Sequence, residues 1–148
     1  MEKTDETELT KFKMYILDEL VRIGCKYINI TTFPDGTLVQ PMKNDPAIQV
    51  DFIKDGSRYV VLITKHIDGE WYNRLVVKVE LTRSFTDSEK IPLSALSVQD
   101  TLTVVKQTEE GTVMRLTHKV YDSFTCKKPC DTNAITELVS HIFEISKL

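Results

Sequence analysis

The spacing of apolar residues changes along this chain, from a helical period at both ends to a strand period in the middle. Near the N-terminus the apolar positions lie three or four residues apart, as on one face of a helix: Leu9, Phe12, Ile16, Leu20 and Ile23. Near the C-terminus the same spacing returns in Ile135, Leu138, Val139, Ile142 and Phe143. Between them, residues 74–82 alternate apolar and polar, which is typical of a strand with one face in water. The pattern predicts a helix at each end and β-structure between.

Local signals mark the ends of both helices. Asp5 with Glu8 three residues later has the spacing of a capping box, and Gly24 follows the last apolar position of the first helix. Upstream of the second helix, Asp131 or Thr132 is the expected N-cap. Each helix therefore has a predicted start, and the first has a predicted glycine stop.

Seven runs rich in β-branched and aromatic residues lie between the helices, at 26–33, 37–42, 48–53, 59–67, 74–82, 102–107 and 113–121. Glycine-containing turns at 34–37, 54–57, 67–70 and 109–112 separate neighbouring runs and predict four antiparallel hairpins. The conformation of 84–100, which contains Pro92, stays open. We expect a single α+β domain over 1–148, with two layers: a meandering antiparallel sheet of about six or seven strands, and both helices on one face.

Charge and cysteine content narrow the function classes. The chain has 19 Lys plus Arg against 22 Asp plus Glu, so it lacks the excess positive charge that nucleic-acid binding needs. No signal-peptide pattern and no apolar run of about 20 residues appears in the sequence. Three cysteines are an odd number, which argues against a disulfide framework. We expect a cytoplasmic protein with reduced thiols that binds neither nucleic acid nor membrane.

Cys126 and Cys130 are the most suggestive pair of side chains for a site. Their spacing differs from the C-x-x-C of zinc knuckles and thioredoxin-like sites, and the sequence contains no second cysteine pair. The alternatives are a surface loop, a redox pair activated by Lys127 and Lys128, and a metal site completed by His118 and His141. We expect the loop, with no metal and no cofactor.

His118 lies in the predicted strand 113–121 and shares its parity with apolar residues, which places it toward the core. A buried imidazole needs a hydrogen-bond partner, and catalysis needs a nucleophile or carboxylate beside it. The sequence identifies no such neighbour. Trp71 and Tyr72 open the cleanest strand, where one ring of the two faces away from the other. Because exposed aromatic residues dominate interface hot spots, these two are the candidate partner-binding residues; the alternative is that both rings cover the core.

The order of elements resembles the type III secretion chaperone-like superfamily. The likeness is carried by the first apolar stripe leading through Gly24 into 26–33, and by 111–121 running into the last stripe. The resemblance implies chaperones that bind partner proteins through the sheet and usually dimerise. Members commonly place a helix between sheet segments, whereas Pro92 makes such a helix short or absent here.

Two functions follow as expectations. The first is a non-enzymatic protein-binding module, chaperone-like or adaptor-like, because two helices can cover only one face of a large sheet; the bare face or a sheet edge would hold a partner protein or a second copy. The alternative is an enzyme or small-ligand-binding protein with a site between sheet and helices near His118 and Cys126.

Overall fold

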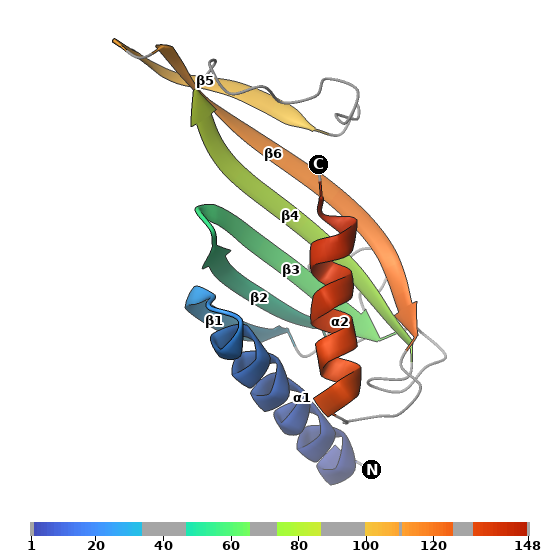
Figure 1. Cartoon of the computed structure of the whole chain (residues 1–148). Coiled ribbons are helices and arrows are strands. Elements are labelled where there is room, and N and C mark those ends of the chain that lie inside the picture. Colours follow the sequence, from blue (N-terminus) through green and yellow to red (C-terminus); the bar gives the residue numbers. More distant parts are fainter. Residues whose placement is uncertain are drawn as a thin grey trace.

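The computed structural model describes residues 2–33, 47–65, 74–86, 100–109, 111–125 and 132–147, which form one sheet and two helices (Figure 1). The helices are α1 (Glu2–Arg22) and α2 (Thr132–Ile145). The strands are β1 (Lys26–Phe33), β2 (Ala47–Lys54), β3 (Ser57–Lys65), β4 (Arg74–Thr86), β5 (Thr101–Thr108) and β6 (Gly111–Thr125). The expected α+β fold with an antiparallel sheet is confirmed, while the strand expected at 37–42 lies outside the described residues.

The six strands form one sheet in the order β1-β2-β3-β4-β6-β5, and every neighbouring pair is antiparallel. The expected simple meander is therefore wrong at its end, because β6 lies between β4 and β5. The lengths of the two strands explain why β6, and not β5, pairs with β4. The long β6 pairs with β4 from residue 74 through 86, whereas the shorter β5 pairs only with the first part of β6.

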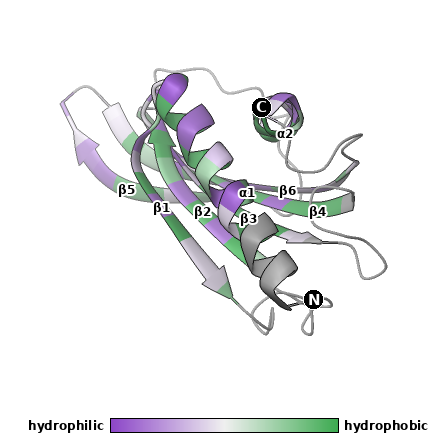
Figure 2. Cartoon of the chain, turned by 90° about the horizontal axis from the view of Figure 1, so that it is seen from below, coloured by the Kyte–Doolittle hydropathy of each residue, from purple (hydrophilic) through white to green (hydrophobic). Residues whose placement is uncertain are grey.

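Both helices lie on the same side of the sheet (Figures 1 and 2). The side chains that face them belong to one alternating set on each strand, because cross-strand partners point to the same face. Ile48, Ile63 and Val77 form one such row, and Val50, Val61 and Val79 form the next. All six are buried in the main core, together with Phe12, Ile16 and Leu20 of α1 and Ile135, Leu138, Val139 and Ile142 of α2.

This core explains why the terminal stripes are helical. Each large apolar side chain removed from water contributes roughly 1.5–3 kcal/mol before conformational entropy is counted. In α1, Phe12, Ile16 and Leu20 are buried, and Leu9 and Ile23 pack against the same core. A helix brings these positions to one face, whereas a strand would place the odd-numbered and even-numbered residues on opposite faces. An aromatic cluster joins the two layers: Phe52 stacks on Tyr59 at 5.0 Å between ring centroids, and Phe143 of α2 meets the Tyr59 ring edge-on at 5.2 Å.

The expected ends of α1 are half right. Gly24 has φ +91° and carries the left-handed stop that its position predicts. The amide of Cys25 donates to the Leu20 carbonyl at 2.9 Å, which closes the last turn. At the other end, the helix begins at Glu2, three residues before Asp5. Asp5 is thus inside the first turns and is not an N-cap.

The expected hairpin at 54–57 lies wholly within the described residues and is confirmed. Of the one expected at 109–112, residue 110 lies outside them, while the antiparallel pairing of its two strands is confirmed. In the turn between β2 and β3, Asp55 and Gly56 have φ of 52° and 80°. Two consecutive positive φ values are the geometry that Asp-Gly favours in a tight hairpin. Glu109 leads into the turn between β5 and β6. The turns expected at 34–37 and 67–70 lie outside the described residues.

Candidate functional site

The face of the sheet opposite the helices is the largest candidate surface. Its residues alternate with the core residues along each strand, so the pairing register lists them row by row. One row reads Gln49, Leu62, Lys78, Tyr121, and the next reads Asp51, Val60, Glu80, Lys119. Ala47, Thr64 and Val76, which share one row of this face, are buried. Further along the face, Lys78, Lys119 and Tyr121 on β4 and β6 are exposed, as are the residues of β5.

Tyr121 is the large aromatic side chain that stands out on this face, with 66% of its surface exposed. It lies in β6 directly opposite Lys78 of β4, and Lys119 precedes it by two residues on the same face. Both lysines are exposed. A tyrosine ring in this position offers a broad apolar contact and a hydroxyl that can donate or accept a hydrogen bond.

The two edges of the sheet differ. All eight residues of β5 are exposed, including the apolar Leu102, Val104 and Val105. At the opposite edge, β1 contacts α1 and has an irregular register between Lys26 and Asn29. Irregular pairing and a covering helix both protect an edge from adding another strand. The β5 edge is therefore the more accessible of the two.

A buried histidine and a buried carboxylate lie on the face of the sheet that is turned toward the helices. Nδ1 of His118 is 2.7 Å from Oδ1 of Asp100, and the two side chains are 8% and 2% exposed. The parity expectation that His118 points inward is confirmed. Its partner was missed, because Asp100 precedes β5 and the register that brings the two together depends on an irregularity at Val105.

The described same-face neighbours of this pair on β4 and β6 are apolar. In the sheet, His118 is opposite Leu81 and has Leu116 and Val120 as its same-face neighbours. These apolar side chains cannot transfer protons or attack a substrate. A hydrogen bond to Asp100 satisfies the imidazole in this apolar setting.

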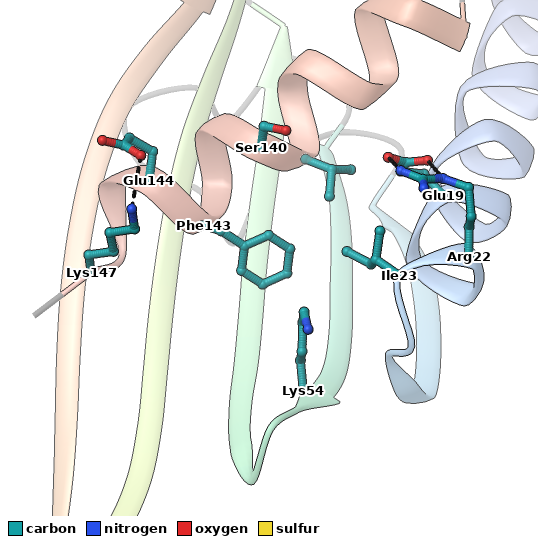
Figure 3. Close-up of a pocket in the computed structure, with 9 residues that line it drawn as sticks. Glu19, Arg22, Ile23, Lys54, Ser140, Phe143, Glu144 and Lys147 are labelled. Carbon is teal, nitrogen blue, oxygen red and sulfur yellow. Dashed lines mark hydrogen bonds and ion pairs between the residues drawn. The ribbon is translucent and has the colours of Figure 1, made fainter.

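A groove lies where the ends of both helices meet the β2–β3 turn, with a volume of about 320 Å³ (Figure 3). Its charged side chains are largely paired with one another: Glu19 accepts two 2.7 Å bonds from Arg22, and Glu144 is 3.3 Å from Lys147. The Arg22 bond holds the pKa of Glu19 below its usual value. Lys54 also lines the groove, and its ammonium is 3.1 Å from the Asp55 carboxylate. The groove thus lies between the C-terminal ends of the two helices, and its charged side chains already form ion pairs.

Several of the candidate site residues predicted from the sequence belong to parts of the chain that the structure does not describe. Trp71, Tyr72, Cys126 and Cys130 all lie outside the described residues. His141, the other histidine considered for a metal site, lies against the Phe124 ring and has Nε2 3.2 Å from Asp122 Oδ2. Among the described residues, no three His, Cys, Asp or Glu side chains come close enough to hold a metal ion.

Comparisons with known proteins add no assignment to this geometry. The chain matches no protein-family model, no curated protein and no solved structure. Within the described parts of the chain, neither helix has the length and apolar character needed to cross a membrane. The functional argument therefore depends on the surfaces described above.

Proposed function

We propose that this chain is a non-enzymatic protein-binding module that holds a partner on the face of its sheet opposite the helices. One observation carries the proposal. Both helices pack on the same face of the sheet (Figure 2). Tyr121 and its two lysine neighbours lie on the other face, where all three are exposed. A second layer of polypeptide is the usual cover for such a face.

The chemistry of this face suits protein recognition. Leu62, Lys78 and Tyr121 form one row, which combines a half-buried aliphatic side chain, a cation and an exposed aromatic ring. Tyrosine is enriched among residues that dominate binding energy, because its ring buries a large area at a small cost in side-chain entropy. The exposed β5 edge adds backbone groups with which an extended segment could pair.

A chaperone-like or adaptor-like role belongs to the same proposal. The order helix, antiparallel strands, helix is the one that resembles the type III secretion chaperone-like superfamily. Trp71 and Tyr72 remain candidate contacts of the partner, and a cytoplasmic location is part of the proposal. Partner binding and self-association are both compatible with the bare face.

Site-specific photocrosslinking tests this proposal. Replacing Tyr121 by benzoylphenylalanine places a photoreactive ring on the bare face. Replacing Tyr27 places the same group on the β1 edge, where the native tyrosine is even more exposed to solvent than Tyr121. We expect Tyr121 to give a discrete crosslinked protein in cell extract or a crosslinked dimer, and Tyr27 to give neither. Equal products from both positions, or no product from Tyr121, would contradict the proposal.

A further inference from the structure

Charge is distributed unequally between the two layers of the molecule. Helix α1 carries six acidic and four basic residues, and α2 carries two acidic and no Lys or Arg residues. The bare face has the opposite balance among the described residues. Its exposed cations include Lys78, Lys106, Arg115 and Lys119, all of which the register places on that face.

Little on the described part of this face neutralises those four cations. Asp51 is already used, because it accepts bonds of 3.1 and 2.7 Å from the Arg58 guanidinium. Glu80 is the remaining described carboxylate on the face; it is half-buried and lies directly opposite Lys119. The cations therefore outnumber the available carboxylates, on a chain whose formal net charge is -3.

The cations are ordered along β6. Arg115 and Lys119 are four residues apart on one face, so their Cα atoms are separated by roughly 13 Å at about 3.3 Å per residue. Tyr121 follows Lys119, and Lys78 lies beside it on β4. A stripe of positive charge thus runs along the strand and ends at an exposed aromatic ring.

Resting on the proposed function, we infer that the partner presents an acidic segment, whose carboxylates lie along Arg115, Lys119 and Lys78 and whose apolar side chain packs on Tyr121. Carboxylates form charge-assisted hydrogen bonds with arginine and lysine. In the two helices acidic residues outnumber basic ones, so an acidic segment is attracted less to that layer. Complementary charge raises the association rate and selects the face on which the partner lands.

Nucleic acid fits this face less well than an acidic protein. Single strands are held mainly by stacking of successive bases on several aromatic rings. The open part of the described face has one exposed aromatic ring, Tyr121, and the chain as a whole repels polyanions because of its negative net charge.

The test uses fluorescent peptides of defined sequence and two charge-matched double variants of the full chain. The probes are a helical peptide with glutamates on successive turns and one leucine, the same peptide with glutamine in place of glutamate, and a single-stranded oligonucleotide. Variant R115E/K119E reverses two cations of the bare face. The control, K11E/K147E, makes the same change in net charge at exposed positions of the helix layer.

We expect the acidic peptide to bind the wild type with an affinity that falls as salt is raised, as for contacts between exposed charges. R115E/K119E should weaken binding roughly tenfold or more, and K11E/K147E less than about twofold. Equal effects of the two variants, or tighter binding of the oligonucleotide than of the acidic peptide, would overturn the inference.

Two further outcomes separate this inference from the proposed function. If the glutamine peptide binds as tightly as the acidic peptide and Tyr121→Ala weakens both, the face is a protein-binding surface without acidic preference, and only the charge inference fails. If the molar mass of the chain rises with concentration and R115E/K119E abolishes the rise, the acidic segment belongs to the helix layer of a second copy, which supports the inference.

Discussion

His118 and Asp100 meet because β5 contains one residue more than regular pairing with β6 requires. Near the turn, Thr108 pairs with Gly111 and Lys106 with Val113; beyond Val105 the register shifts by one, so that Val104 pairs with Met114 and Thr101 with Thr117. Continuing the shifted register places Asp100 opposite His118, where their side chains bond at 2.7 Å. Without the shift, Thr101 would occupy that position. The extra residue at Val105 therefore determines the partner of the buried imidazole.

Removing the Asp100 carboxylate should destabilise the fold. Asp100→Ala leaves Nδ1 of a buried histidine without its partner, which costs about 1–3 kcal/mol. Asp18→Ala is the control, because Asp18 is an exposed carboxylate on α1, and its change should stay below about 0.5 kcal/mol. Urea unfolding followed by circular dichroism measures both. Equal stability of Asp100→Ala and wild type would show that the pair contributes nothing.

The same pair shows what the sequence can and cannot predict. Alternation along β6 is enough to place His118 inward, because strand parity is local. The identity of its partner depends on a one-residue irregularity in the neighbouring strand β5. The residue types at Val104, Val105 and Lys106 do not predict that irregularity. Parity predicts which face a residue occupies, but a register shift decides what lies opposite.

The helices were likewise predictable from local sequence, whereas the strand order was not. The three-and-four spacing from Leu9 to Ile23 predicted a buried helical face, and Phe12, Ile16 and Leu20 within it are buried. The insertion of β6 between β4 and β5 was not predictable from the turn at Glu109, because a hairpin fixes which strands pair with each other but not which of the two joins the rest of the sheet. The candidate residues Trp71 and Tyr72 stay predictions.

Acid should weaken the fold partly through Glu19. Its hydrogen bonds with Arg22, more than the electrostatic attraction, hold the pKa of this buried carboxyl below the usual 4.5. Because the folded-state pKa is the lower one, the stabilisation is present above about pH 4.5 and is lost as pH falls through the folded pKa. Glu19→Gln should therefore lose less stability than wild type as pH falls from neutral through the folded-state pKa of Glu19.

Urea midpoints at a series of pH values measure this difference. Glu144→Gln is the control, because it removes an ion pair whose two side chains are each 72% exposed and should change stability at neutral pH by less than about 0.5 kcal/mol. Parallel pH profiles for Glu19→Gln and wild type would argue against the contribution of the Glu19 carboxylate.

Truncating the aromatic cluster should be more costly than any surface change. Phe52 is 1% exposed, and its ring stacks on Tyr59 and lies 6.0 Å from the Phe143 ring. Phe52→Ala removes this packing between sheet and helix and should cost about 3–5 kcal/mol. Tyr27→Ala, which truncates an exposed ring, should cost less than about 1 kcal/mol. Similar losses for the two variants would contradict the described core.

Cys25 should react slowly with alkylating agents. Burial raises the pKa of this thiol, with the nearby Asp55 carboxylate acting in the same direction and Lys54 opposing it. Since the thiolate is the reacting species, iodoacetamide at pH 8 should modify Cys25 at least about tenfold more slowly in the native protein than in urea. Peptide mapping by mass spectrometry follows Cys25 separately from the other cysteines. Equal rates in the two conditions would mean that the thiol is accessible in the folded state.

Hydroxyl-radical footprinting of Tyr121 and Phe124 tests the central claim most directly. These two aromatic residues lie three positions apart on β6 and face opposite sides of the sheet. We expect Tyr121 to be oxidised rapidly in the free protein and protected severalfold in the partner complex or a self-assembled form, with Phe124 slow in both. Slow oxidation of Tyr121 in the free protein, or an unchanged rate in the complex, would contradict a bare, partner-binding face.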